Sequence, residues 1–441
     1  MLRPDTLVHS TGRIGKGDPR GSRKEGGYMR LKPLVVALAA IMLAVPACKS
    51  GDEEAEKSGG GGGTLTLGAA LSLTGSLSRE GGLTKDGYEY CKQVVNDKGG
   101  VNAGGDSYKL QIKYQDDTSE PDTAAQLVDQ FNDQDVKFIL GPYGSSSTEA
   151  AAAVVERTGQ VMVDSAGADD EIFTQGYRNT FAVLSPASQY LASIVDAITE
   201  LADPKPKTVA ILSADDGFSQ TAAKGGAAEA EAQGLQVVAQ ESFPEGATDV
   251  SAALTKVKAK NPDLILGSVH LEEGIAIMQQ SEELGINPSG GFGLTVAVPT
   301  PDFVETLGKA ADFTVGSTQW TPNFAGQDDV FGTAHEYATG FEQALGYAPE
   351  YHNAEASAAC LTMVKAIEEA GSVDPAKVRD TLAGLSIDTF FAHIQFDETG
   401  KNADKPMSVV QIQNGKVVPV WPESDSTQPL LWPTPPFDQR S

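Results

Sequence analysis

From Thr64 onward the chain alternates short aliphatic or β-branched runs with longer amphipathic segments, and this alternation restricts the possible folds most strongly. TLTLGAAL, YKLQIKY and VKFIL read as strands, and the segments between them carry apolar residues at helical spacing. Strands that alternate with helices are typical of βαβ units. A second series of such units, with TVAIL and DLILG as strands, begins after Pro186. The sequence therefore predicts an α/β protein with two doubly wound parallel-sheet lobes, which bind ligands at the carboxyl ends of their strands.

The composition excludes nucleic acid as a partner. With 441 residues, 40% of them hydrophobic and 21% charged, the chain is long enough for two sizeable cores. Its formal net charge of −27, with no basic block in the body of the chain, would repel phosphate backbones. We expect a monomer with an acidic, solvated surface.

The amino-terminal segment has the pattern of an export signal. In residues 29–48, MRLKPLVVALAAIMLAVPAC, two basic residues precede an apolar run of 12 residues from Leu34 to Val45. This run is shorter than the roughly 20 residues that a membrane-spanning helix needs. Met29 stands where a signal peptide should begin, so Met1 and Met29 are both possible starts of the chain.

A cysteine ends this segment. Val45-Pro46-Ala47-Cys48 resembles the lipobox of bacterial lipoproteins, in which the chain is cut before the cysteine and the thiol carries a diacylglyceryl group. The resemblance implies that Cys48 is lipidated and that the protein touches the membrane only through this anchor. The polar, glycine-rich residues after Cys48 are expected to form a flexible leash. We expect an exported protein in the periplasm or at the cell surface.

Motifs for catalysis or cofactor binding are absent from the sequence. It has no GxxxxGKS/T phosphate loop and no HExxH, and VDSAG at 163–167 lacks the first glycine of a nucleophile elbow. The histidines are scattered singly along the chain: His9, His270, His335, His352 and His393. We therefore expect no catalytic residue, no metal site and no cofactor.

Two further cysteines, Cys91 and Cys360, fall on predicted helices. An exported protein can form disulfides, but a sequence does not give the distance between two cysteines. Of the two alternatives, we favour two separately buried thiols over a disulfide.

Seven segments form an ordered series along residues 64–441: LTLGAALSLTGSLSREG, VKFILGPYGSSST, VMVDSAGADDEI, TVAILSADDGFS, NAEASAACLTMVKAIEEAGSVDPAKVRDTLAG, IQFDETGK and QNGKVVPVWP. In this order they resemble the type I periplasmic binding proteins that serve ABC importers, specifically the leucine/isoleucine/valine-binding family. The resemblance implies that the chain crosses between its lobes three times, near residues 184–186, 319–322 and 402–406. The implied division is 1–47 for an upstream extension and signal peptide, 48–63 for the lipidated cysteine and leash, 64–185 plus 320–403 for lobe I, and 186–319 plus 404–441 for lobe II.

The GPYGSSST segment is the first expected binding element. Ser145 and Ser146 open a predicted helix, where free N–H groups and hydroxyls suit a carboxylate, although serines at this place also cap helices. The resemblance favours binding, because the residue that matches Ser145 contacts the ligand carboxylate in relatives. Ala166, Gly167 and Ala168 match a loop whose backbone atoms hold the ligand, and Ala168 lacks the hydroxyl of the family's threonine.

The second lobe is expected to contribute less polar contacts. Phe218 matches a tyrosine that closes over the ligand, and Val296 falls near the position of the family's acidic anchor for the ligand ammonium. Another anion would then have to bind an amine. Glu80, in an SLSREGG loop, is the first candidate, and Asp215 or Asp216 are the alternatives.

The expected function is capture of a small polar ligand, a branched-chain or other amino acid or an amide, between the lobes. The loaded form would then dock on the permease subunits of an ABC importer. As an alternative, the same form docks on a membrane receptor and signals without transport. A lipoprotein hydrolase is the third alternative, and the sequence offers it no catalytic residues.

Overall fold

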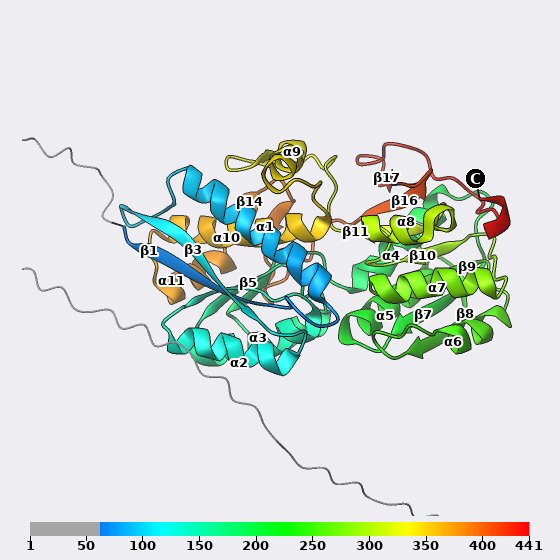
Figure 1. Ribbon diagram of the computed structural model, residues 1–441, viewed down its shortest axis with the longest axis horizontal. Helices are drawn as coiled ribbons and strands as arrows, with labels where there is room; N and C mark the ends of the chain where they lie inside the picture. Colours follow the sequence, from blue (N-terminus) through cyan, green and yellow to red (C-terminus); the bar gives the residue numbers. More distant parts are fainter. Residues whose placement is uncertain (1–61, 441) are drawn as a thin grey trace, which may run out of the picture. The chain divides into compact units, whose positions relative to one another are not determined.

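The computed structural model describes residues 62–440, and two large β-sheets organise them (Figure 1). The predicted signal peptide, the lipidated Cys48 and the leash up to residue 61 lie outside the described residues. The first sheet has six strands in the order β2-β3-β1-β4-β5-β6, in which only β2 is antiparallel to its neighbour. Its strands are β1 (Thr64–Leu71), β2 (Val101–Ala103), β3 (Asp106–Asp116), β4 (Phe138–Leu140), β5 (Val161–Asp164) and β6 (Thr180–Ala182). We call this sheet with its helices the first lobe.

Helices lie on both faces of the first sheet. The pair α1 and α10 packs against one face, and the pair α2 and α3 packs against the other (Figure 1). The helices of this lobe are α1 (Ser78–Asp97), α2 (Pro121–Asp133), α3 (Ser145–Thr158), α9 (Ala334–Leu345), α10 (Tyr351–Ala370) and α11 (Pro375–Ala383), with a 3-10 turn at Asp170–Thr174. Two small antiparallel pairs accompany them: β12 (Gln327–Asp328) with β13 (Gly332–Thr333), and β14 (Ser386–Asp388) with β15 (His393–Gln395).

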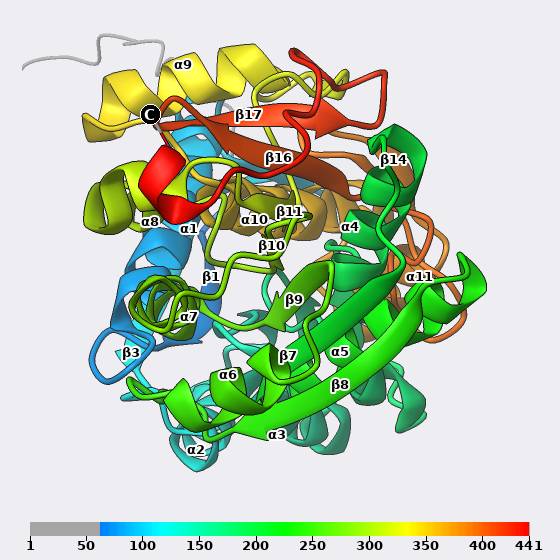
Figure 2. The same cartoon turned by 90° about the vertical axis from the view of Figure 1, so that its right-hand side faces the viewer.

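The second sheet has seven strands in the order β17-β16-β11-β10-β9-β7-β8 (Figure 2). Its strands are β7 (Thr208–Ala214), β8 (Gln236–Phe243), β9 (Leu264–Ser268), β10 (Phe292–Leu294), β11 (Val315–Thr318), β16 (Ser408–Gln413) and β17 (Lys416–Trp421). Its helices are α4 (Ser188–Leu201), α5 (Gly217–Ala232), α6 (Ser251–Lys258), α7 (Leu271–Glu283) and α8 (Pro301–Leu307), with 3-10 turns at Gly308–Ala311 and Phe437–Gln439. These elements form the second lobe.

The alternation of side chains along β7 shows why its sheet has two covered faces. Ala210 and Leu212 join the core beneath α6, α7 and α8, whereas Val209 and Ile211 join the core beneath α4 and α5. Both sets are buried, so residues 209–212 of the strand are all apolar, as expected for a parallel strand between two helix layers. The prediction of a two-lobed α/β fold is confirmed, with β16 and β17 as an antiparallel addition at one edge.

The chain passes between the lobes three times, after β6, after β11 and after β15. One residue from each passage meets the other two in a buried hydrogen-bond network. The Lys405 ammonium donates to the carbonyl oxygen and Oε1 of Gln319 at 2.7 and 2.9 Å. The Ser185 amide donates to the same Oε1 at 3.0 Å, and its hydroxyl donates to the Lys405 carbonyl oxygen at 2.9 Å. We call Ser185, Gln319 and Lys405 the hinge network.

The prediction of an SLSREGG loop is wrong, because α1 already begins at Ser78 and includes Glu80 in its first turn. Within this segment, Gly81 serves close packing. A Cβ atom there would lie 2.0 Å from the carbonyl oxygen of Ser72, so only glycine lets the helix approach β1.

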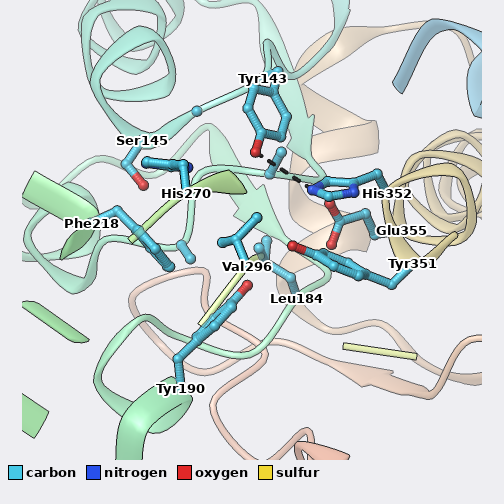
Figure 3. Close-up of a pocket in the computed structure, with 13 residues that line it drawn as sticks. Tyr143, Ser145, Leu184, Tyr190, Phe218, His270, Val296, Tyr351, His352 and Glu355 are labelled. Carbon is cyan, nitrogen blue, oxygen red and sulfur yellow. Dashed lines mark hydrogen bonds between the residues drawn. The ribbon is translucent and has the colours of Figure 1, made fainter. Parts of the chain in front are cut away.

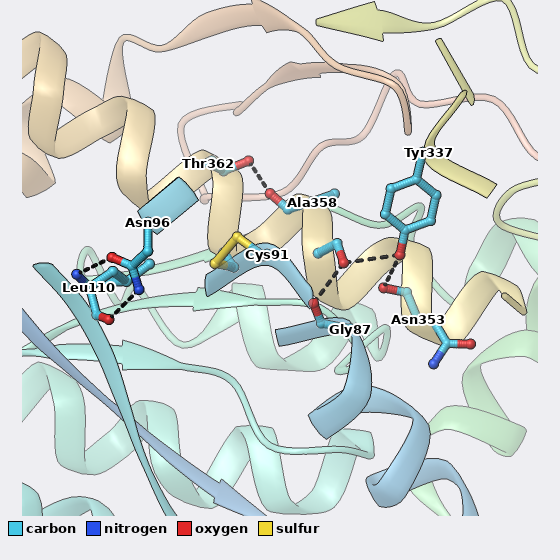
Figure 4. Close-up of a disulfide and its surroundings, with 10 residues drawn as sticks. Gly87, Cys91, Asn96, Leu110, Tyr337, Asn353, Ala358 and Thr362 are labelled. Atoms are coloured by element: carbon cyan, nitrogen blue, oxygen red, sulfur yellow. Dashed lines mark hydrogen bonds between the residues drawn. A yellow bond between two sulfur atoms is a disulfide. The ribbon is translucent and has the colours of Figure 1, made fainter. Parts of the chain in front are cut away.

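The expectation of two separate thiols is also wrong, since Cys91 and Cys360 form a disulfide (Figure 4). Their Cα atoms are 6.3 Å apart although 269 positions separate them in sequence. The helices that carry them, α1 and α10, pack along each other, and Ser357 of α10 donates a 2.7 Å hydrogen bond to the carbonyl oxygen of Gly87 in α1. This helix pair brings the two sulfur atoms together.

Candidate ligand-binding site

The start of α3 is the first part of the site. Gly144 has a φ of 88°, a value that suits glycine, and this turn directs the chain from β4 into the helix. Gly144 is also the N-cap residue, and no side chain caps the helix. The first N–H groups of a helix have no intrahelical acceptor, so they are available to an anion here. Capping therefore does not explain the serine cluster.

Ser145 is buried, and its hydroxyl accepts a hydrogen bond of 3.1 Å from the backbone N–H of Asp169. The hydroxyl hydrogen stays free to bind an acceptor in the adjoining space. Asp169 continues this contact into the second lobe, because its Oδ1 accepts from the hydroxyl of Thr221 on α5 at 2.7 Å. Ser145 is thus held at the junction of the two lobes.

The loop after β5 is shaped by a buried carboxyl group. Asp164 accepts hydrogen bonds from the backbone N–H groups of Ala166 and Gly167, the latter at 2.9 Å, and from the Thr148 hydroxyl at 3.2 Å. Burial outweighs these hydrogen bonds and raises the pKa of Asp164 to about 6. A Cβ atom on Gly167 would lie 2.5 Å from Thr148, so this glycine packs the loop against α3. The loop thereby presents Ala166 and Ala168 beside Ser145.

These elements wall a small cavity at the junction of the two lobes (Figure 3). Both lobes contribute, and much of the wall follows strand ends, as expected for parallel sheets. The lining residues are Tyr143, Gly144, Ser145, Ala166, Ala168, Leu184, Tyr190, Phe218, His270, Val296, Tyr351, His352 and Glu355. We call this space the interlobe cavity.

Five of the eight residues predicted to bind ligand line the interlobe cavity: Ser145, Ala166, Ala168, Phe218 and Val296. Of the other three, Gly167 lies outside the cavity lining and packs its loop against Thr148 of α3. Ser146 is exposed and faces a neighbouring hollow that Ser145 shares. Glu80 lines a wider hollow at the outer side, together with Arg79 and Glu245.

The residues that sequence reasoning missed are the polar and aromatic groups of the wall. Tyr351, His352 and Glu355 come from the first turns of α10, and Tyr190 comes from α4. The carboxyl of Glu355 is buried, and its Oε2 has no hydrogen-bond partner among the described residues. The segment that contains Glu355 entered the sequence analysis only through the family resemblance. No sequence pattern near Glu355 indicates that α10 packs beside the loop that follows β4.

The second lobe adds a charged pair beside an aromatic cluster. Phe218 meets Tyr190 edge to face with ring centroids 5.0 Å apart and lies 5.4 Å from the His270 ring. His270 Nε2 is 3.8 Å from Oδ1 of Asp216, an ion-pair distance that is too long for a hydrogen bond. Burial opposes protonation of His270, but the nearby carboxylates, Asp216 foremost, raise its pKa to about 9. Oδ1 of Asp216 also caps α5 through the Ser219 amide, whereas its Oδ2 has no hydrogen-bond partner among the described residues.

An arginine joins the lobes at the outer rim. The Arg79 guanidinium on α1 contacts Glu350 at 2.6 Å and pairs with Asp302 on α8 of the second lobe. Asp302 is about half exposed, with 46% of its side chain accessible. The structure thus shows the lobes in contact at the rim as well as at the hinge network.

The described residues were also searched for a metal-binding cluster and for a membrane-spanning helix. Across residues 62–440, no three His, Cys, Asp or Glu side chains are grouped so that they could hold a metal ion. Nor does any helix in that range combine the length and the apolar character needed to cross a lipid bilayer.

Known proteins resemble the chain over most of its length. The curated relatives include a Leu/Ile/Val-binding protein homolog 7 of Brucella suis, 23% identical over 419 residues, which cover 91% of this chain and 99% of the relative. A leucine-, isoleucine-, valine-, threonine- and alanine-binding protein of Pseudomonas aeruginosa is 25% identical over 77% of this chain and 88% of its own.

Solved structures share the fold. A leucine-binding protein of Thermotoga maritima superposes with a TM-score of 0.72 at 23% identity, covering 81% of this chain and 98% of its own. A branched-chain amino acid transporter substrate-binding protein of Streptococcus pneumoniae in complex with isoleucine gives a TM-score of 0.70 at 21% identity, covering 80% and 97%. The family model described as "Periplasmic binding protein" matches residues 64–416. The chain therefore belongs to the periplasmic binding protein family, whose members bind solutes and are not enzymes.

Proposed function

We propose that this protein is the extracytoplasmic substrate-binding lipoprotein of an ABC importer and that it captures a small amino acid in the interlobe cavity. One observation carries the proposal: residues of both lobes, many of them in segments that follow strands, wall one cavity, and thin, hydrogen-bonded passages join the lobes beside it. Rotation about such passages opens and closes a cleft of this kind. The names of the relatives, which bind leucine, isoleucine, valine, threonine or alanine, support an amino-acid ligand.

We propose that residues 64–185 and 320–403 form lobe I and that residues 186–319 and 404–441 form lobe II. In them, Ser145 and the first amides of α3 bind the ligand carboxylate, the backbone of Ala166 and Ala168 adds further hydrogen bonds, and Phe218 and Val296 enclose the side chain.

A thermal-shift screen tests the capture. The full chain is heated with each of the twenty amino acids, with amides and with organic acids. A ligand present at 100 times its dissociation constant adds roughly 2.7 kcal/mol of stability, so a true ligand stands out. Ala166→Leu fills the cavity and should abolish the shift, whereas Ala228→Leu on the exposed face of α5 should leave it unchanged. A shift of equal size in Ala166→Leu would contradict capture in this cavity.

The anchor is tested separately. We propose that Cys48 is the mature amino terminus and carries lipid, which mass spectrometry of the intact exported protein can detect. A mature protein that begins elsewhere, or a Cys48→Ser variant that stays equally membrane-associated, would overturn the anchor but not ligand capture.

Transport and sensing differ in the step after capture. Import predicts permease and ATPase genes beside this one and loss of solute uptake when the gene is deleted. Unchanged uptake of a confirmed ligand in such a deletion strain would favour the sensory alternative.

A further inference from the structure

Glu355 is a buried ionisable group that has no role in the capture proposed so far. It lies in the second turn of α10 with 2% of its surface exposed, and it forms part of the wall of the interlobe cavity. Its Oε2 has no hydrogen-bond partner among the described residues. Buried carboxyl oxygens normally have partners, so this oxygen is available to a group bound in the cavity.

The described residues offer Glu355 no ion-pair partner. None of the ion pairs within residues 62–440 includes it, and the Lys405 ammonium, which influences it electrostatically, donates instead to Gln319 in the hinge network. Burial raises the pKa of Glu355 well above its usual range, and the carboxyl of Asp164 adds to this effect. Burial thus opposes ionisation of Glu355 in the cavity without ligand, and a cation bound beside the carboxyl would favour it.

The position of Glu355 suits one end of a short zwitterion. Figure 3 shows Ser145 on one side of the cavity, and Glu355 with Tyr351 and His352 on the opposite side. A carboxylate bound at the start of α3 would thus leave an amine free to turn toward Glu355. Building on the proposed capture of an amino acid, we propose that Glu355 binds the ligand ammonium group and thereby selects amino acids over the corresponding acids without an amine.

The other acids considered for this role are placed less favourably. Glu80 faces the outer hollow and lies outside the lining of the interlobe cavity. Asp215 is exposed and bonded to Gln220, and Asp216 caps α5 and pairs with His270. Val296, near the family's acidic position, offers only an apolar side chain. In this chain, the acid proposed to bind the ligand ammonium group therefore lies on α10 of the first lobe and not in the second lobe.

Calorimetric titration with matched probes tests this selection. Each of L-leucine, L-isoleucine, L-valine, L-threonine and L-alanine is compared with the carboxylic acid that has the same carbon skeleton but no amine. The parent protein should bind at least one amino acid far more tightly than its partner acid. Glu355→Gln keeps the shape of the neutral acid and should weaken binding of that amino acid by about 10- to 100-fold, as expected for a lost charged hydrogen bond. Its affinity for the partner acid should stay unchanged.

Two variants complete the design. Glu369→Gln removes an exposed carboxylate from the same helix and should bind like the parent. Glu355→Asp keeps the charge but withdraws it by one methylene, and should show an intermediate affinity for the amino acid.

The outcomes separate this proposal from the capture on which it rests. If Glu355→Gln binds the amino acid as tightly as the parent does, or if the parent binds both probes of a pair equally, Glu355 is not the anchor and capture still stands. If the parent binds none of the probes of either kind, amino-acid capture itself fails.

Proton release gives a second readout that a purely structural role would not produce. When an ammonium group ionises Glu355, the protein should release up to one proton at a pH below the raised pKa of this carboxyl, measured as a dependence of the binding enthalpy on the buffer. Glu355→Gln should bind the same amino acid with less release, and equal release in both proteins would contradict the assignment. The ionisable groups that face this site from neighbouring elements are Asp164, Tyr143, Tyr190, Tyr351, His352, His270 and Lys405, and the variant leaves each of them in place.

Discussion

At the scale of single residues, Ser145 serves both the fold and the proposed site. Replacing it with alanine leaves the buried N–H of Asp169 without its acceptor, which should cost about 1–3 kcal/mol of unfolding free energy. The loss of a hydrogen bond to a charged carboxylate should also lower ligand affinity by about 10- to 100-fold. Urea unfolding and calorimetry measure the two effects, and the exposed Ser146→Ala should change neither. Lower stability with unchanged affinity would restrict Ser145 to a structural role.

His270 makes a prediction about pH. Because Asp216 and other carboxylates raise its folded pKa from 6.5 to about 9, the protonated form stabilises the folded state. This contribution, about 1–3 kcal/mol, is complete below about pH 6.5 and is lost as the pH rises through about 9. The unfolding free energy of the parent should therefore fall over this window relative to a His270→Gln/Asp216→Asn variant. Parallel pH profiles of the two proteins would show that the pair adds no stability.

Sequence reasoning found the residues that follow strands and missed those that a distant helix contributes. Ala166 follows a strand directly, and Ser145 and Phe218 lie in the first turn of a helix that follows a strand, so the local strand-then-helix pattern predicts their positions. Glu355 lies within a long helix whose sequence resembles that of other buried helices. Its place in the cavity depends on how α10 packs against the first sheet, which involves contacts over hundreds of positions.

At the scale of elements, the alternating pattern predicted β1, β3, β4, β7 and β9, whereas packing decided where α1 begins. The expected SLSREGG loop is instead largely the first turns of α1, in which Gly81 allows close contact with Ser72 at the end of β1. The pairing of Cys91 with Cys360 likewise follows from the contact of α1 with α10, which no local signal specifies.

The disulfide makes a prediction about stability. It closes a loop with a sequence separation of 269, so it should restrict the unfolded chain strongly. Reduction, or the double change Cys91→Ala and Cys360→Ala, should lower the unfolding free energy by about 2–5 kcal/mol. Urea unfolding of the oxidised and reduced protein gives this difference. Equal midpoints would mean that the helix pair needs no covalent link.

At the scale of the whole molecule, the rim contact should favour the closed form. Arg79 and Asp302 belong to different lobes, so opening separates them. Exposed ion pairs contribute about 0–1 kcal/mol, and Asp302→Asn should therefore lower ligand affinity only about two- to fivefold, through faster dissociation. Stopped-flow measurement of the dissociation rate checks this, with Asp122→Asn on exposed α2 as the matched control. An unchanged dissociation rate would show that the pair does not hold the lobes closed.

A crystal structure with the amino acid that gives the largest thermal shift tests the central claim most directly. We predict one ligand in the interlobe cavity, with its carboxylate at the start of α3 beside Ser145 and its ammonium group within hydrogen-bonding distance of Glu355. A ligand found instead in the outer hollow beside Arg79 and Glu245, or one bound in the cavity with its ammonium group turned away from Glu355, would contradict this claim.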